Sequence, residues 1–390
     1  MKKSATNSAG MKRYNRRLIL NIIRKSPVSR AELARMTGLT RAAVTLIVDA
    51  LLQEGVLIET GTAQADYGRK PVLLDLNSES CYAIGVSIAR DGCSIGILNI
   101  KGVVLSKREV DLGRCHDARQ STAQIISEAR KLITDSSLPQ QRFLGIGIST
   151  PGPVDITTGT ILNPPNFDLW HNVSIVQEFQ KHFSFCVCLE NNAASLALAE
   201  KSYGGGAEYQ SFMLLVVDTG IGAGLIINEN LYRGVGGFGS EVGHTSIDIH
   251  GKACSCGNKG CLEGYASILA LIDGVNTVDP TIRTWNDVVD RALQGDEACR
   301  KAVENEAFYL SAGIINAMNI LELDAVILAG DIQYKPALLL GLIRSHVETR
   351  AINRHIRTIP VTTASIGKDA EVLSSAAILF EKYFSGEVEV

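Results

Sequence analysis

The 390-residue sequence predicts a small helical domain with a two-stranded hairpin, followed from about residue 80 by a larger α/β region. Apolar residues recur at helical spacing up to residue 52, whereas later ones form short runs bounded by Gly, Pro and Asp. The charge divides at the same place, because residues 1–80 carry 13 Lys and Arg against 7 Asp and Glu, and the rest carry 25 against 34. We therefore expect the two regions to have different partners.

The composition excludes several classes of protein. Hydrophobic residues make up 46% of the chain and charged residues 20%, which is ordinary for a globular protein and excludes disordered and fibrous classes. No apolar run approaches the roughly 18 residues that a membrane span needs, and the basic N-terminus lacks the apolar stretch of a signal peptide. We expect a cytoplasmic protein with no membrane partner.

The first two helices are indicated by an apolar stripe and a capping motif. The stripe ends near Ser26-Pro27 and consists of Tyr14, Leu18, Ile19, Ile22 and Ile23. Ser29 and Glu32 then have the spacing of a capping box, which starts a second short helix. Gly38 permits the tight turn that ends this helix.

A third helix follows Thr40, which is a suitable N-cap, and ends at Gly55. Its core-facing stripe is Val44, Ile47, Val48, Leu51 and Leu52. The opposite face near the helix N-terminus has the short and basic side chains that approach base edges in a recognition helix: Thr40, Arg41, Ala42 and Thr45.

A hairpin completes the N-terminal region. Residues 56–58 and 72–74 are apolar, and the polar stretch between them contains Arg69 near its tip, where phosphate or minor-groove contact is expected. Residues 1–48 hold 11 basic side chains and one acid, Glu32. Residues 1–80 therefore predict a winged helix-turn-helix domain that binds double-stranded DNA. The alternative is a docking or dimerisation module.

The larger region alternates strands and helices. Strands are predicted over 82–87, 94–99, 143–149, 212–217 and 325–329, and a helix over 121–134. Several of these strands are almost entirely apolar, as in sheets that are covered on both faces.

Four potential metal ligands are closely spaced. Three thiolates and one imidazole fit a tetrahedral structural zinc site that leaves no open position for catalysis, with the ligands His244, Cys254, Cys256 and Cys261. The alternative is four buried residues that bind nothing. We leave the other six cysteines as reduced packing residues.

Four motifs occur in a fixed order: Gly145-Ile-Gly-Ile-Ser-Thr-Pro-Gly-Pro153, Asp218-Thr-Gly-Ile-Gly-Ala-Gly224, Gly239-Ser-Glu-Val-Gly-His244 and Cys254-Ser-Cys-Gly-Asn-Lys-Gly-Cys-Leu-Glu263. Together they resemble the ROK family of repressors and sugar kinases over residues 81–385. The resemblance implies a two-lobed, actin-like ATPase fold of the sugar-kinase type. We expect a small lobe over 81–195 and 370–390, and a large lobe with the zinc site over 196–369.

The resemblance also implies a sugar site and zinc at the four ligands. The family's sugar contacts fall on Asn166, Asn191, Glu241, His244 and Glu263. His244 can serve twice, with one ring nitrogen on the metal and the other toward a hydroxyl.

The kinase chemistry of the family is incomplete in this chain. Where ROK kinases have a catalytic aspartate, the sequence has Asn192, which has no usable proton affinity but can still hydrogen-bond a sugar hydroxyl. The first phosphate loop reads Ser87-Ile-Ala-Arg-Asp-Gly92 and lacks a carboxylate and glycines of the family pattern. The second begins with Asp218 in place of glycine, and a glycine is replaced in 328–331. We therefore expect no enzyme activity and no catalytic residue.

The expected function is a sugar-responsive DNA-binding regulator, a repressor of carbohydrate-utilisation genes, that binds a sugar or sugar phosphate without phosphorylating it. We expect a homodimer or homotetramer on a pseudo-palindromic operator. Two alternatives stay open. One is an active hexose kinase with Glu190 or Asp168 as a substitute base, and the other is a regulator controlled by a protein partner.

Overall fold

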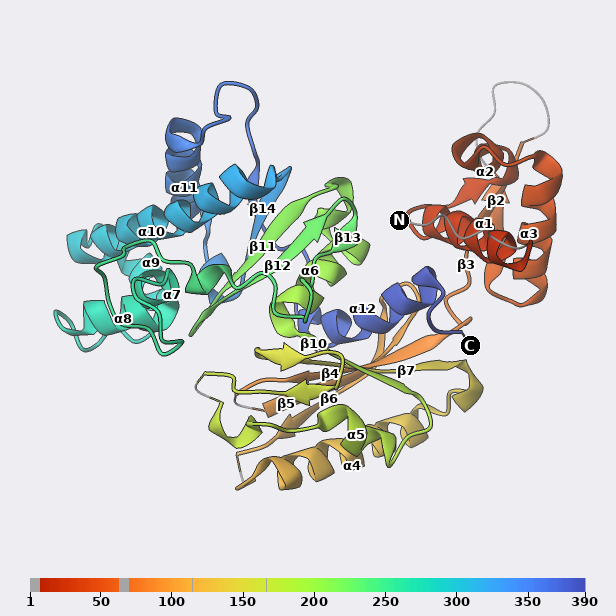
Figure 1. Ribbon diagram of the computed structural model, residues 1–390, viewed down its shortest axis with the longest axis horizontal. Coiled ribbons are helices and arrows are strands. Elements are labelled where there is room, and N and C mark those ends of the chain that lie inside the picture. The colour runs from red at the N-terminus through yellow and green to blue at the C-terminus, as the bar shows by residue number, and fades with distance from the viewer. Residues whose placement is uncertain (1–7, 63–69, 91, 114, 166, 390) are drawn as a thin grey trace. The chain divides into compact units, whose positions relative to one another are not determined.

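The computed structural model describes residues 8–62, 70–90, 92–113, 115–165 and 167–389, and they form two compact units (Figure 1). The first unit comprises Met1–Ser149, Ile175–Leu189 and Glu371–Val390, and the second comprises Thr150–Ser174 and Glu190–Ala370. This division differs from the expected lobes. Residues 150–174 and 190–195 belong with the second unit, in which Glu190 and Asn191 line a pocket.

The N-terminal domain has three helices and a three-stranded sheet of order β1-β3-β2. The helices are α1 (Ser8–Ile23), α2 (Arg30–Thr37) and α3 (Arg41–Gln53), and the strands are β1 (Val28–Ser29), β2 (Leu57–Thr62) and β3 (Val72–Leu76). The sequence did not predict β1, which pairs antiparallel with β3. The tip of the predicted wing, with Arg69, lies outside the described residues.

The local signals in this domain form as predicted. Ser29 and Glu32 make both hydrogen bonds of a capping box at the start of α2, and Gly38 ends that helix with a φ of 70°. Thr40 caps α3 by accepting a hydrogen bond from the backbone N–H of Ala43. The apolar stripe of α3 faces the domain core, where Val44, Val48 and Leu51 are fully buried.

The first α/β sheet has the strand order β10-β7-β4-β5-β6. Its strands are β4 (Tyr82–Ile88), β5 (Gly92–Asn99), β6 (Val104–Asp111), β7 (Phe143–Thr150) and β10 (Cys186–Asn191). Helices α4 (Ala118–Ser136) and α5 (Ile175–Gln180) cover one face, and α12 (Ala370–Ser385) covers the other (Figure 1). Coverage on both faces explains why β4, β5 and β7 are almost continuously apolar.

The second sheet has the order β13-β12-β11-β14-β15. Its strands are β11 (Phe212–Val217), β12 (Ile221–Ile227), β13 (Asn230–Leu231), β14 (Ala325–Ala329) and β15 (Val361–Thr363). One face packs against α6 (Asn192–Tyr203), and the other contributes to a large core. The helices of that core are α8 (Ile268–Asn276), α9 (Trp285–Leu293), α10 (Glu297–Leu321) and α11 (Ala337–Arg350).

Short elements complete the described chain. They are β8 (Val154–Asp155), β9 (Thr160–Ile161), α7 (Glu263–Ala266) and the 3-10 turns Gln140–Arg142, Asp168–Trp170, Gly205–Glu208, Val242–His244 and Asp331–Gln333. Among the described helices, none combines the length and the apolar character that crossing a bilayer requires.

Candidate ligand pocket and metal centre

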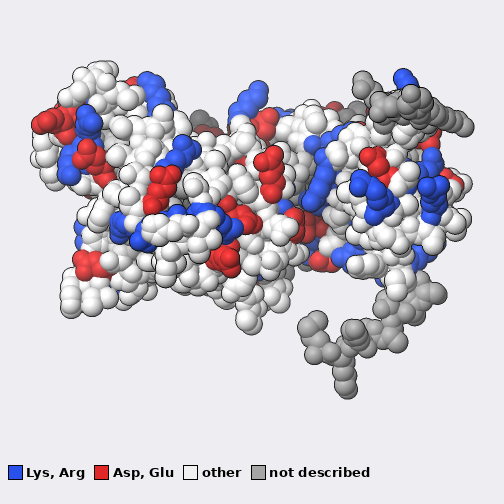
Figure 2. Space-filling view, turned by 90° about the horizontal axis from the view of Figure 1, so that it is seen from above, with Lys and Arg blue, Asp and Glu red and all other residues white. Residues whose placement is uncertain are grey.

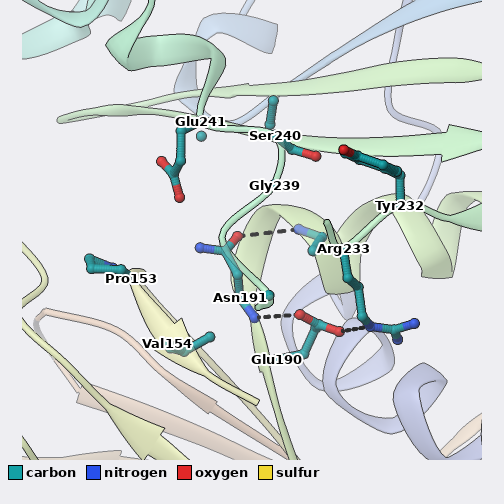
Figure 3. A pocket seen from close by; sticks show the side chains of 13 residues that line it. Pro153, Val154, Glu190, Asn191, Tyr232, Arg233, Gly239, Ser240 and Glu241 are labelled. Atoms are coloured by element: carbon teal, nitrogen blue, oxygen red, sulfur yellow. Dashed lines mark hydrogen bonds and ion pairs between the residues drawn. The ribbon is translucent and has the colours of Figure 1, made fainter. Parts of the chain in front are cut away.

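An open pocket of about 430 Å³ lies in the second unit (Figure 3). Residues from the segment before β8, the end of β10, the start of α6, β12 and the loop after β13 form its walls. Its polar side chains include Glu190, Asn191, Tyr232, Arg233 and Glu241. Asn191 and Glu241 point toward the same space in Figure 3. The pocket therefore brings together two of the predicted sugar contacts from positions 50 residues apart.

A buried ion pair forms one side of this pocket. Glu190 is only 3% exposed, and one carboxylate oxygen accepts a 2.6 Å hydrogen bond from Nε of Arg233. Its other oxygen accepts from the backbone N–H of Asn191 at 3.2 Å. Both oxygens of Glu190 are thus engaged, which makes it a poor candidate for the substitute base. Arg233 could not be predicted as a pocket residue, since no local signal in the sequence distinguishes it from other surface arginines.

The two asparagines at the end of β10 have different positions. Asn191 is the N-cap of α6, and its Oδ1 accepts from the backbone N–H groups of Ala193 and Ala194. Within the described part of the chain, its Nδ2 makes no hydrogen bond. Asn192 is exposed, bonds to the N–H of Ala193 at 2.8 Å, and does not line the pocket. The role of Asn192 in sugar binding stays a prediction, and Asn166 lies outside the described residues.

Glu241, His244 and Glu263 form an electrostatic group beside the pocket. Glu241 is exposed by surface area, but partial desolvation of its carboxyl raises the pKa; His244 opposes this shift and the negative charge of Glu263 adds to it. One oxygen of Glu263 accepts from the backbone N–H of Ile221 at 2.9 Å, so this side chain also fixes the turn before β12. His244 and Glu263 are not among the residues that line the pocket, and their contact with a ligand stays a prediction.

The four predicted metal ligands converge in the second unit. Their ligand atoms all lie within 4.8 Å of one another. Nδ1 of His244 is 3.7 Å from Sγ of Cys254, and the Sγ atoms of Cys256 and Cys261 are also 3.7 Å apart. These separations match the edges of a tetrahedron with metal–ligand bonds of about 2.0–2.3 Å. The four side chains therefore form a group that could hold a metal ion.

Backbone geometry explains how this cluster forms. The backbone N–H of Cys254 donates to the carbonyl of Asn258, which closes a tight loop around Cys256. Gly260 adopts a φ of 67°, and a β-carbon at this position would collide with the carbonyl of Asp248. Only glycine fits such a left-handed and crowded position. The turn then returns Cys261 to the side of His244, whose carbonyl lies 3.3 Å from the Cys261 Sγ.

The segments that resemble the nucleotide-binding loops of a kinase make close contacts within the second unit. Gly222 and Gly224 lie within β12, and a β-carbon at Gly224 would overlap the carbonyl of Ala193 and the side chain of Ala197 in α6. These glycines are therefore explained by close packing of helix and strand. Asp218 accepts a 2.5 Å hydrogen bond from the backbone N–H of Asp331. The Asp218 carboxylate therefore already uses a backbone donor of the loop that follows β14.

The recognition-helix residues are exposed on the N-terminal domain. Arg41, Ala42 and Thr45 are all solvent-accessible at the start of α3, and no acidic residue occurs in its first turn. Leu46 is 73% exposed beside them and supplies the kind of apolar surface that contacts a thymine methyl group. The sequence analysis did not select Leu46. Lys and Arg side chains are prominent over this part of the chain, at the right of Figure 2.

Two family matches cover most of the chain. Residues 12–58 match a winged helix-turn-helix DNA-binding family, and residues 83–382 match the ROK family. The chain belongs to the ROK family. The resemblance that the four motifs indicated is confirmed, and the N-terminal domain identifies the chain as a DNA-binding member of this ROK family.

Known ROK proteins include both repressors and kinases. A xylose repressor from Bacillus spizizenii is 32% identical over 379 residues, which are 96% of each chain. One crystal structure is that of a ROK family transcriptional regulator described as a homolog of the E. coli MLC protein. It has a TM-score of 0.82 at 24% identity, and the match covers 96% of this chain and 97% of that chain, which supports the fold. A ROK hexokinase from Thermus thermophilus has a TM-score of 0.67 at 25% identity and covers 78% of this chain and 100% of its own. The repressor similarity therefore extends over nearly the whole chain, whereas the hexokinase similarity leaves about a fifth of it uncovered.

Proposed function

We propose that this protein is a transcriptional repressor whose ROK domain binds a neutral sugar and does not phosphorylate it. The observation that carries the proposal is the pocket itself, in which hydroxyl-binding groups of Asn191 and Glu241 face one space beside a carboxylate that is already paired. The winged helix-turn-helix match and the full-length similarity to a xylose repressor support the DNA-binding half of the proposal.

The charges around the pocket favour a neutral sugar over a sugar phosphate. Glu190 and Glu241 line the pocket and Glu263 lies near Glu241, whereas Arg233 is the one Lys or Arg among the lining residues. The Nε of that arginine is already bound to Glu190. A phosphate would add about two negative charges to a site that has more carboxylates than cations. Carboxylates and amides instead bind pairs of sugar hydroxyls as acceptors and donors. The name of the xylose repressor relative makes an aldopentose the first ligand to test.

The absence of phosphoryl transfer follows from two groups. Asn192 supplies no general base at the position of the kinase aspartate, and loss of such a base costs about 10²- to 10⁴-fold in rate. The carboxylate of Asp218 bonds to the backbone N–H of Asp331, which places negative charge where a nucleotide phosphate would seek a donor. Both features act against catalysis.

We further propose that the His244 and cysteine cluster holds one structural zinc ion. Three thiolates and an imidazole with these separations are the donor set that zinc prefers in closed sites. When bound, the ion would cross-link the loop that carries Cys254 and Cys256 to the turn that carries His244. The same turn begins beside Glu241, so the metal would also order one wall of the pocket.

Regulation would follow from a shift in population. A sugar that binds one conformation of the repressor better than another favours that conformation, and the shift in DNA affinity cannot exceed the difference in sugar affinity. For regulators this coupling is typically about 1–3 kcal/mol, or 5- to 150-fold. We propose a homodimer or homotetramer on a pseudo-palindromic operator, because two symmetry-related winged helix-turn-helix domains bind two half-sites of similar sequence.

The test combines DNA selection with ligand titration. The zinc-loaded full chain is used to select sites from random DNA, and the affinity for the enriched site is measured by fluorescence anisotropy with and without xylose, glucose and their phosphates. We expect one free sugar to weaken DNA binding at least fivefold, and the phosphates to have little effect. Glu241→Gln should keep DNA binding and lose the sugar response.

Three results would contradict the proposal. No enriched DNA sequence would remove the repressor assignment. ADP formation that depends on added sugar and Mg-ATP would show an active kinase. DNA binding that no sugar changes would favour control by a protein partner.

A further inference from the structure

Two cysteines on one strand form a pair that the proposed function does not use. Cys186 and Cys188 lie in β10, and their Sγ atoms are 3.6 Å apart. Side chains at positions i and i+2 of a strand point to the same face, which explains the proximity. Cys186 is exposed and Cys188 is partly exposed, whereas Cys81, Cys93 and Cys299 are buried. β10 is also an edge strand of its sheet, so one side of it is not covered by a neighbouring strand.

A charged side chain from another element lies beside this pair. The ammonium group of Lys382 in α12 interacts electrostatically with both thiols and forms a 2.9 Å ion pair with Glu387. The hydrogen bond from Cys188 is the largest effect on Cys186 and, with the charge of Lys382, lowers its pKa to about 6, although burial and Glu387 oppose this shift. Burial instead raises the pKa of Cys81 to about 12. An exposed thiol with a lowered pKa and a second thiol in contact has the surroundings typical of a reactive cysteine.

We propose that Cys186 and Cys188 are a redox-active thiol pair that hydrogen peroxide converts into a reversible disulfide. In the first step the Cys186 thiolate attacks one peroxide oxygen, the O–O bond breaks, hydroxide leaves and a sulfenic acid forms. In the second step the sulfur of Cys188 attacks the sulfur of Cys186, the S–O bond breaks, and the Cys188 proton leaves with the hydroxyl group as water. The two sulfurs lose two electrons, and the peroxide gains them.

Disulfide formation should be strained and therefore readily reversed. Residues i and i+2 of an extended strand have Cα atoms about 6.6–6.8 Å apart. Most disulfides join Cα atoms about 5.5–6 Å apart, and strained disulfides are the more easily reduced ones. This span lies at the long end of the range of about 4.4–6.8 Å that disulfides usually adopt, so we expect ring closure to draw the two residues together and to bend β10. Its last residues are Glu190 and Asn191, which line the pocket. We expect oxidation to disturb the Glu190–Arg233 ion pair and to lower sugar affinity, a consequence that rests on the proposed function.

The chemical step can be tested without any assumption about the ligand. Trypsin is expected to release residues 182–201 as one peptide with both cysteines, because Lys181 and Lys201 bound a stretch without Lys or Arg. The zinc-loaded full chain is treated with equimolar hydrogen peroxide, free thiols are blocked with N-ethylmaleimide, and peptides are weighed. We expect the mass of this peptide to fall by two hydrogen atoms as the disulfide forms. Its thiols should become unreactive toward N-ethylmaleimide about tenfold faster than the thiol of half-buried Cys115. Dithiothreitol should restore both thiols.

Variants separate the roles of the two cysteines. Cys188→Ser should stop at the sulfenic acid, which dimedone traps on Cys186. Cys186→Ser should leave Cys188 unreacted, and Lys382→Gln should slow the reaction severalfold. Cys115→Ser is the matched control and should react like the wild type. Oxidation of Cys115 as fast as Cys186, or full blocking of both thiols after peroxide, would overturn the proposal.

The consequence is tested by the sugar affinity of reduced and oxidised protein. If the oxidised protein binds a sugar several times more weakly than the reduced protein does, the result supports the link from the thiols to the pocket. Equal affinities would disprove this link while leaving the proposed function intact. If the disulfide forms but even reduced protein binds no sugar, the thiol chemistry stands and the proposed function fails.

Discussion

A carboxyl group in the core of the second unit should limit the stability of the protein. Glu306 lies on α10 and is 1% exposed, among apolar residues such as Val303, Ala307 and Leu310. Both of its side-chain oxygens are buried, and no group among the described residues hydrogen-bonds to them. Burial raises the pKa of this carboxyl well above its usual value, so the group favours the neutral form in the folded state.

The cost of this arrangement can be estimated. A buried polar group without a hydrogen-bond partner typically costs about 1–3 kcal/mol. Glu306→Met removes the polar group, keeps a similar volume and retains a good helix former. We expect this variant to gain about 1–3 kcal/mol of unfolding free energy. Glu306→Gln keeps a buried polar group and should differ from wild type mainly in its response to pH.

The pH response has a definite sign. Because the folded-state pKa is raised, the unfolded chain ionises first as pH rises, and stability falls from the unfolded pKa up to the folded pKa. The slope over this window is about 1.4 kcal/mol per pH unit. As far as Glu306 is concerned, the free energy of unfolding is therefore greatest at a pH below the pKa that this carboxyl has in the unfolded chain. Glu306→Gln and Glu306→Met should both lack this component of the slope.

Tryptophan fluorescence provides a local assay. The chain has two tryptophans, Trp170 and Trp285, and both are buried within the second unit. Urea titrations at pH 5 and pH 8, followed by this fluorescence, therefore report on the unit that contains Glu306. If the wild type and Glu306→Gln change equally with pH, or if Glu306→Met is less stable than wild type, the reasoning is refuted.

Four further predictions concern the DNA-binding domain, the pocket and the metal. Arg41→Ala should weaken binding to the selected DNA site by about 1–3 kcal/mol and reduce the salt dependence of binding, which fluorescence anisotropy would measure. Lys131→Ala, which removes an exposed lysine outside the N-terminal domain, is the control. Equal affinities of the two variants would contradict the recognition-helix assignment. Ser29→Ala should remove the capping box of α2 and cost about 0.5–2 kcal/mol in that domain, measured by amide hydrogen exchange, with sugar binding unchanged. Glu190→Gln should remove the ion pair with Arg233 and reduce the preference of the pocket for a free sugar over its phosphate, which calorimetric titration would show. An unchanged preference would argue against the proposal that the pocket carboxylates disfavour a sugar phosphate. Metal analysis should find about one zinc ion per chain, and a strong chelator should lower the thermal midpoint of the second unit; a metal-free protein after gentle purification would exclude the zinc proposal.

Features that depend on neighbouring residues could be predicted from the sequence. The capping box at Ser29, the turn at Gly38 and the N-cap at Thr40 involve partners no more than four residues away, and all three form. The apolar strands were recognised within one or two residues of their bounds for the same reason. The metal cluster was also predictable, because three of its ligands occur within eight residues and their chemistry is distinctive.

Features that depend on distant residues could not be predicted. β1 has only two residues and exists because it pairs with β3, in which the partner residues lie 44 and 46 positions later in the chain. The glycines of β12 have the spacing of a phosphate-binding loop, and only the proximity of α6 shows that they permit packing. The same limit applies to residues 150–174 and 190–195, which we expected in the small lobe from the family resemblance and which group with the second compact unit through contacts between distant residues.

The amino-acid sequence by itself therefore indicated the N-terminal winged helix-turn-helix domain, the ROK family, the cluster of one His and three Cys and most of the secondary structure, because each rests on local periodicity, capping or a compact motif. Only the tertiary structure decided how the pocket is charged. Glu190 and Arg233 are separated by 43 residues, so no local pattern joins them. Their ion pair connects the end of β10 to the loop after β13, and our proposal of a neutral ligand depends on that contact.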